Sequence, residues 1–225
     1  MSVGHDLPMA IILGLDVSTS CTGVCVLDGS APVDERMYSN VKVLDRIEFK
    51  GCKTFWDKVD RVEDYFCELE KIHHIARIVL EEPLMGFRPG MSSAQTISML
   101  LRFNGIVSNL ARKQFGAVPE YISANHARKV CGIKLQRTAV AGMSQKEQVF
   151  KHMREHDLQQ YPWPQKKSGN VVDWSRDATD AYVIARAAAV DGVIVPVKKM
   201  KKAPKPPGGC VFPCDPPCPG KPMKA

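Results

Sequence analysis

Five short apolar segments along the chain have the length and composition of buried β-strands. They are residues 10–16, 21–27, 41–49, 76–81 and 118–122. Only the polar stretch Val17-Ser18-Thr19-Ser20 separates the first two segments, which predicts a tight turn between neighbouring strands. The later strands are far apart in the sequence and need longer connections.

Amphipathic or alanine-rich segments between and after these strands predict helices. They are residues 55–74, 93–114, 124–132, 145–156 and 175–190. Thr54, Ser123 and Ser144 stand where an N-terminal capping side chain is expected, and Ser144 with Glu147 has the spacing of a capping box. Consecutive strands followed by alternating helices and strands predict an α/β fold with one mixed sheet, in contrast to a TIM barrel or a helical bundle.

The 225 residues suffice for one domain, and 44% hydrophobic with 24% charged residues is ordinary for a globular protein. We expect this domain over residues 1–197. Residues 198–225 hold eight of the sixteen prolines and seven lysines without apolar periodicity, which predicts a disordered basic tail. No segment has the ~18 apolar residues of a membrane span, and no secretory signal is recognisable. We therefore expect a cytoplasmic protein without a membrane partner. Five cysteines lie among apolar segments and are expected to be free thiols: Cys21, Cys25, Cys52, Cys67 and Cys131.

Charge is unevenly distributed along the chain. Residues 102–176 carry 13 Lys and Arg against 5 Asp and Glu, whereas residues 1–101 carry 10 against 15. A basic segment beside an acidic remainder favours a surface that binds a polyanion over a uniformly solvated one.

Acidic residues stand at the ends of otherwise apolar elements. Asp16 ends the first predicted strand, Glu81 and Glu82 end the fourth, and Asp177 and Asp180 share one face of the last helix. Singly, these residues could cap a turn, face solvent or favour a helix N-terminus. Together they predict an all-oxygen site for Mg²⁺ or Mn²⁺, because a buried carboxylate needs compensating donors or a metal ion.

Several motifs, in order, resemble the RuvC family of Holliday junction resolvases over about residues 9 to 190. They are Ala10-Ile-Ile-Leu-Gly-Leu-Asp16, Thr22-Gly23, Ile78-Val-Leu-Glu81-Glu-Pro, Val118-Pro-Glu-Tyr121, Lys146-Glu-Gln-Val149 and Asp177-Ala-Thr-Asp180-Ala-Tyr-Val-Ile-Ala185. The resemblance implies a ribonuclease-H-like fold with a mixed five-stranded sheet, a homodimer, and Mg²⁺-dependent cleavage of four-way DNA junctions in recombination, repair or the processing of branched DNA.

By motif position, the resemblance implies that Asp16, Glu81, Asp177 and Asp180 are the metal ligands. The alternation of side chains between the two faces of the strand does not by itself decide whether Glu81 or Glu82 is the ligand, because both faces are expected to be buried. Lys146 matches a lysine that the family uses near the scissile phosphate, and Arg128 or Lys129 is the nearest candidate for a second basic residue. Two departures from the bacterial pattern are more typical of a viral or otherwise divergent member of the family. They are Val17-Ser18 in place of Pro-Gly, and the additional stretch 134–141. A viral member would work in the cytoplasm of its host.

Phosphate contacts are expected chiefly from the basic segment. The candidates are Arg128, Lys129, Arg137, Lys146, Lys166 and Lys167. Tyr161, Trp163 and Trp174 beside these lysines could stack on bases or anchor their loop. In the loop 83–90, Phe87 could act as a wedge between bases or pack under its own loop. The predicted helix 93–114 is our choice for the subunit contact, because Ile97, Leu100, Leu101 and Ile106 give it more apolar surface than one sheet face needs.

Other functions remain open at this stage. A ribonuclease-H-like nuclease could act on RNA–DNA hybrids or on flaps, and residues 13–20 also resemble the first phosphate loop of actin-like ATPases and sugar kinases. Those ATPases need a second domain and an adenosine site, which the sequence does not offer. A binding protein without activity would be expected to lose acidic residues, and all four candidates are present.

Overall fold

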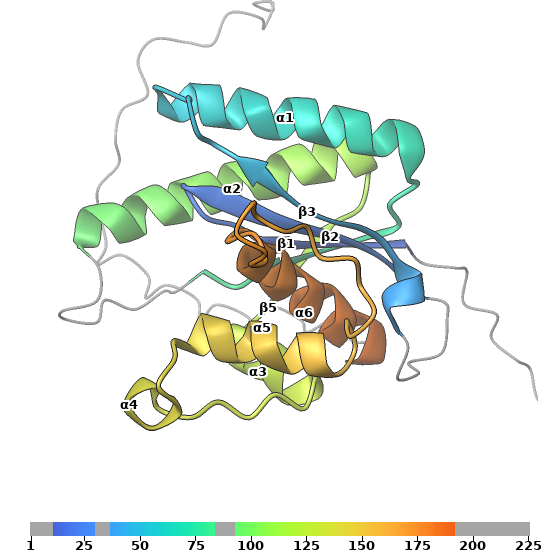
Figure 1. Cartoon of the computed structure of the whole chain (residues 1–225). Helices are drawn as coiled ribbons and strands as arrows, with labels where there is room; N and C mark the ends of the chain where they lie inside the picture. The colour runs from blue at the N-terminus through green and yellow to red at the C-terminus, as the bar shows by residue number, and fades with distance from the viewer. Residues whose placement is uncertain (1–10, 30–36, 84–92, 192–225) are drawn as a thin grey trace, which may run out of the picture. The chain divides into compact units, whose positions relative to one another are not determined.

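The computed structural model describes residues 11–29, 37–83 and 93–191, which belong to one compact unit, residues 1–195 (Figure 1). Phe87, the predicted tail 198–225 and the predicted boundary at residue 197 lie outside the described residues. No helix of the described part is long and apolar enough to cross a membrane. The five cysteines of the described part are free thiols.

The described strands form one mixed five-stranded sheet in the order β3-β2-β1-β4-β5, which confirms the predicted fold class. Its strands are β1 (Ile11–Asp16), β2 (Cys21–Asp28), β3 (Val41–Glu48), β4 (Arg77–Glu81) and β5 (Pro119–Ile122). β1, β2 and β3 pair antiparallel, whereas β4 pairs parallel with both β1 and β5. The short turn 17–20 permits antiparallel pairing, and the parallel strands need helical crossovers.

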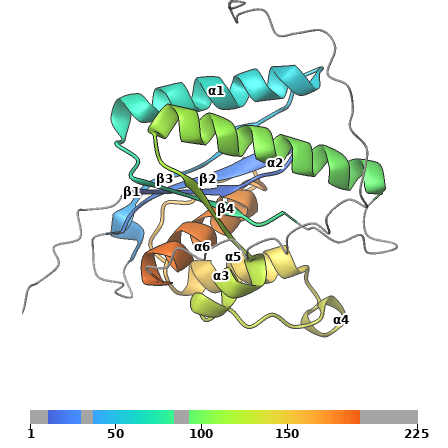
Figure 2. The same cartoon turned by 180° about the vertical axis from the view of Figure 1, so that it is seen from behind.

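Helices cover both faces of the sheet (Figures 1 and 2). α1 (Phe55–Ile72) and α2 (Ala94–Phe115) lie on one face, and α3 (Ala124–Val130), α5 (Gln145–Glu155) and α6 (Ser175–Asp191) lie on the other. The sequence did not predict α4 (Thr138–Ala141) or the 3₁₀ turn Met37–Asn40. Each has four residues, too few to display a helical period.

Side-chain caps begin most of these helices. Thr54 accepts from the Asp57 N–H, and Asp57 completes a capping box at α1. Ser123 and Ser144 cap α3 and α5. Only one half of the capping box predicted at Ser144 forms: the Ser144 hydroxyl accepts from the Glu147 N–H. The Glu147 carboxylate pairs with the Arg176 guanidinium of α6 in place of the Ser144 N–H.

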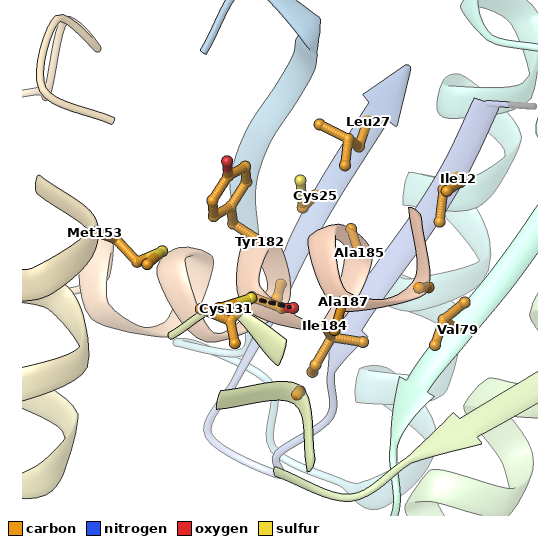
Figure 3. Packing of buried hydrophobic residues seen from close by; sticks show 14 of the residues in the cluster. Ile12, Cys25, Leu27, Val79, Cys131, Met153, Tyr182, Ile184, Ala185 and Ala187 are labelled. Atoms are coloured by element: carbon orange, nitrogen blue, oxygen red, sulfur yellow. Dashed lines mark hydrogen bonds between the residues drawn. The ribbon is translucent and has the colours of Figure 1, made fainter. Parts of the chain in front are cut away.

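The alanine-rich helix α6 is buried in the layer between β1, β2 and the helices α3 and α5. Tyr182, Ala185 and Ala187 belong to one core cluster with Cys25 of β2 and Met153 of α5 (Figure 3). Alanines have no side chain beyond Cβ, so the helix axis can approach the sheet closely. The carboxylates near the start of α6 are thereby held on a rigid element.

Candidate active site

Two acidic side chains meet where the parallel neighbours β1 and β4 end. Asp16 and Glu81 are the last residues of their strands. Successive side chains of a strand point to opposite faces, so Asp16 shares the α6 face with Ile12, and Glu81 shares it with Val79. Glu82 follows the strand and is exposed. The sheet therefore brings Glu81 beside Asp16 and leaves Glu82 in solvent.

Two glycines allow α6 to approach these strand ends. A Cβ atom on Gly14 would lie 2.5 Å from the carbonyl oxygen of Ala181, and one on Gly23 would lie 2.1 Å from the carbonyl oxygen of Asp177. Contacts below 3.0 Å are essentially never made by real Cβ atoms, so neither position accepts a side chain without a shift of the helix. This close approach brings Asp177 and Asp180 over the ends of β1 and β2.

Lys146 lies among three of the four carboxylates. Its Nζ donates to Asp177 Oδ1 at 2.5 Å and lies 3.4 Å from Asp180 Oδ2 and 3.7 Å from Asp16 Oδ2. The Lys146 side chain is 42% exposed, whereas that of Asp180 is 11% exposed. The ammonium group therefore contacts the carboxylate cluster (Asp16, Glu81, Asp177 and Asp180) from its solvent side.

Burial and mutual repulsion make this cluster difficult to ionise completely. Burial raises the pKa of Asp16 to about 8, with further contributions from Asp180 and Glu81. Burial also raises the pKa of Glu81 and of Asp180. Burial lowers the pKa of Lys146, but Asp16, Asp180 and Asp177 together raise it more, so it stays above its ordinary value. One lysine therefore does not neutralise the cluster, which favours a further cation.

Arg128 is the second basic group at the cluster. Burial raises the pKa of Glu81 and of Asp180, and the Arg128 guanidinium opposes this rise in both. Arg128 is half-buried on α3, which follows β5, whereas its neighbour Lys129 is exposed. Of the two residues that the sequence left open, Arg128 is the one whose charge acts on the carboxylates.

The other predicted phosphate-binding residues lie outside the cluster. Arg137 is the exposed N-cap of α4, and Lys166 pairs with Asp173 at 2.7 Å. Lys167 is exposed. Among residues 11–29, 37–83 and 93–191, no ion pair joins these three cations to the carboxylate cluster.

The aromatic residues beside Lys166 pack in a way that fits the second of the two roles that the sequence left open, the anchoring of their loop. Tyr161 and Trp163 stack edge to face with centroids 4.8 Å apart, and Trp163 also packs on Phe150 at 5.1 Å. Both pack against the core on the α6 side and so anchor the loop. Trp174 packs against the same core, and the Arg46 guanidinium lies over its ring, 4.7 Å from the centroid.

Sequence reasoning missed the part played by the glycines and by Arg46. Gly14 interrupts an otherwise apolar strand, which is a recognised signal of close backbone approach. That signal could have indicated that a helix packs on β1 at this position. No comparable signal marks Arg46, because its partner Trp174 is 128 residues away in the chain.

The chemistry of the donor set fits a hard divalent cation, since carboxylate oxygens are the ligands that Mg²⁺ and Mn²⁺ prefer. In the described residues, no group of three or more His, Cys, Asp or Glu side chains is arranged as a ready metal site. Asp16, Asp177 and Asp180 instead converge on Lys146 Nζ. A metal ion would therefore have to replace the lysine as their counter-ion.

No known family's sequence profile matches the chain, and no curated protein matches it. Solved structures do resemble it. RuvC of T. thermophilus in complex with a Holliday junction substrate has a TM-score of 0.53 and 14% identity, with 81% of this chain and 94% of that chain covered. A second Thermus thermophilus RuvC structure has a TM-score of 0.50 and 17% identity, with 81% of this chain and 96% of that chain covered. The yeast mitochondrial Holliday junction resolvase Ydc2 has a TM-score of 0.45 and 16% identity, with 81% of this chain and 78% of that chain covered. The resemblance noted from the motifs is thus confirmed for the fold: the chain has the ribonuclease-H-like fold of RuvC.

Proposed function

We propose that this chain is a divalent-metal-dependent endonuclease that cuts branched DNA, with the four-way junction as its main substrate. One observation carries the proposal: four carboxylates from β1, β4 and α6 meet at one end of the sheet, beside Lys146 and Arg128. A fold alone hosts many functions, so the argument depends on this site.

Asp16, Glu81, Asp177 and Asp180 would hold Mg²⁺, or Mn²⁺ in its place, after exchanging Lys146 for the cation. Bound Mg²⁺ would supply Lewis-acid stabilisation of the charge that develops on the reacting phosphate. Hydrolysis of the P–O3′ bond by water would leave a 5′-phosphate and a 3′-hydroxyl.

Lys146 and Arg128 would stabilise the same phosphate electrostatically. Lys146 stays protonated at neutral pH, because Asp16, Asp180 and Asp177 together raise its pKa more than burial lowers it. It therefore contacts phosphate oxygens as a cation and does not accept the proton of the attacking water. Released from Asp177, its partly exposed side chain can reach a phosphate that approaches from solvent.

Affinity for DNA would come chiefly from the exposed cations Lys129, Arg137, Lys166 and Lys167. Counterion release then makes binding fall steeply with salt. Phe87 would help to open the junction centre. If so, Phe87→Ala reduces cleavage of intact junctions far more than cleavage of junctions already unpaired at the centre, and equal loss on both contradicts the role.

We place the contact of a homodimer on the outer face of α2. Paired cuts on opposed strands need two sites related by a two-fold axis. Met99 is 38% exposed, and Trp56 at the start of α1 is 57% exposed. Arg102 lies over the rings of both Phe55 and Trp56, so this part of α1 adjoins α2.

Sedimentation tests the dimer. Met99→Glu should yield monomers that nick one strand at a time, and Val118→Glu should stay dimeric, because Val118 is 76% exposed before β5. A wild-type monomer that still makes paired cuts would remove the dimer from the proposal.

Cleavage by purified full-length protein tests the activity. The substrates are a four-way junction, a linear duplex, an RNA–DNA hybrid and a flap, each with Mg²⁺ or with EDTA. We expect paired, Mg²⁺-dependent cuts in the junction. If the protein prefers to cut the hybrid or the flap, the proposed substrate is wrong, but the proposed nuclease activity stands.

Asp177→Asn tests the site itself. It keeps the size of the side chain and removes one charge, so it should abolish cleavage and preserve junction binding. Asp60→Asn makes the same chemical change at an exposed position of α1 and should cut like the wild type. Cleavage by Asp177→Asn at the wild-type rate would show that the site is wrongly assigned.

A further inference from the structure

A groove of about 610 Å³ opens beside the carboxylate cluster, on the side of β3. The turn after β1, the end of β3, the start of α1 and the loop before α6 surround it. The lining residues that bear on its ligand are Arg46, Lys50, Lys58, Lys166, Trp174 and Asp177.

The groove is continuous with the candidate active site because Asp177 belongs to both. Across the sheet, Arg46 is on β3, Asp177 packs over Gly23 of β2, Asp16 ends β1 and Glu81 ends β4. Arg128 follows β5 on the far side. The cluster therefore lies between two basic regions, Arg128 on one side and the groove on the other.

Two cations in the groove have no carboxylate partner within the described residues. Lys58 Nζ donates to the Thr19 carbonyl oxygen at 2.7 Å, and Lys50 is exposed at the end of β3. A neutral carbonyl oxygen orients the Lys58 ammonium without cancelling its charge. Both lysines therefore present a full positive charge to a ligand.

The other two cations are paired with exposed acids. Arg46 contacts Glu48 at 3.0 Å, and Lys166 contacts Asp173 at 2.7 Å. The side chain of Asp173 is 81% exposed and that of Glu48 is 50% exposed. Exposed pairs of this kind contribute about 0–1 kcal/mol, so a phosphate group can displace the carboxylates.

Trp174 gives the groove a fixed shape. The Arg46 guanidinium lies over its ring, 4.7 Å from the centroid, and the ring packs against the core on the α6 side. A guanidinium packed on an aromatic ring keeps N–H donors that suit phosphate oxygens.

We infer that this groove binds the sugar–phosphate backbone of the DNA strand that is cut, beyond the scissile phosphate on the β3 side. The inference rests on the proposed nuclease function and adds a binding subsite to it. Neighbouring strands of a sheet lie about 4.8 Å apart, so β3 is about 10 Å from β1. Successive phosphates of one strand are roughly 6–7 Å apart through space, more than the rise of about 3.4 Å along the helix axis, so the groove holds phosphates about one to two nucleotides from the cut.

The test compares Lys50→Gln/Lys58→Gln with a control, Lys71→Gln/Lys113→Gln. The control lysines lie in the last turns of α1 and α2, and Lys71 is about 20 Å along α1 from Lys58. Both variants lose the same charge. Junction affinity is measured by fluorescence anisotropy in Ca²⁺ at several salt concentrations, and cleavage is measured in Mg²⁺.

We expect the groove variant to bind at least ~10-fold more weakly, with a log–log salt slope shallower by about 1.4 to 1.8, because two phosphate contacts are lost. Its kcat at saturating junction should stay near the wild-type value. The control should match the wild type. Single methylphosphonates along the cut strand should weaken wild-type binding about one to two nucleotides from the cut, on one side, and have no such effect on the groove variant.

The outcomes separate the two proposals. If the wild type binds and cuts but the groove variant matches the control, the groove inference is wrong and the nuclease stands. If the wild type neither binds nor cuts branched DNA, both are wrong. Thermal denaturation checks that Lys58→Gln leaves the fold intact, and Lys50→Glu, at an exposed position, repeats the test without that concern.

Discussion

Gly23→Ala is the substitution through which packing and activity are most directly connected. The new Cβ atom would lie 2.1 Å from the Asp177 carbonyl oxygen and 2.6 Å from its carbonyl carbon. Both atoms are backbone atoms of α6, so no side-chain rotation can relieve the clash. The start of α6 has to move away from β2.

The size of this movement follows from the contact distances. Reaching even 3.0 Å, the lower limit for real Cβ contacts, requires about 0.9 Å, and ordinary contact at 3.4 Å requires about 1.3 Å. Overpacking of this kind costs about 1–3 kcal/mol, or roughly 2–12 °C in Tm for a chain of this length. A displacement of ~1 Å of catalytic groups can lower the rate about 100-fold, and Asp177 and Asp180 move with the helix.

The assay combines thermal denaturation with junction cleavage, and Gly105→Ala is the control. A Cβ on Gly105, in the exposed part of α2, meets no atom within 4 Å, so stability should rise by roughly 0.5–1 kcal/mol. We expect Gly23→Ala to stay folded and lose about 100-fold in cleavage. Wild-type Tm and wild-type cleavage in Gly23→Ala would refute the close-packing argument.

Three further predictions concern charges. Lys146→Met should reduce cleavage about 100-fold yet enlarge the rise in Tm on adding Mg²⁺, because the ammonium that the metal must displace is gone; an unchanged rise would contradict this exchange. In EDTA, Tm should fall as pH increases from about 4 to about 8, because folding raises the pKa of Asp16 from 3.8 to about 8 through burial and the folded state binds the extra proton over that range. Mg²⁺ should reduce that fall, and a flat Tm in EDTA would count against the buried cluster. Asp157→Ala should cost about 3–5 kcal/mol by urea unfolding, because its carboxylate holds Arg186 Nε at 2.6 Å and accepts from the Tyr182 hydroxyl at 3.2 Å; a loss below 1 kcal/mol would show that the pair is not needed.

The sequence by itself determined the elements of the fold and their class. Continuous apolar runs and a 3.6-residue period are local properties, so the strands and the helix α1 could be predicted within a few residues of their observed bounds. Motif order was enough to indicate a ribonuclease-H-like fold, which the structure confirms. The four-residue helix α4 was missed because it is shorter than two turns.

The tertiary structure decided which side chains meet. Glu81 and Glu82 are the same residue type at the end of the same apolar segment. Only the pairing of β4 beside β1 turns Glu81 toward Asp16. Arg128 and Lys129 are adjacent in the chain, and only the position of α3 in the fold lets the charge of Arg128 act on Glu81 and Asp180.

Lys146 was expected near the scissile phosphate, but its place among Asp16, Asp177 and Asp180 depends on how closely α6 approaches the sheet. Gly14 and Gly23 permit that approach because they have no Cβ atom to clash with the backbone of α6. The absence of a Cβ matters only once the helix is packed against these strands. Local periodicity thus specifies the elements, whereas steric fit between elements remote in the chain specifies the site.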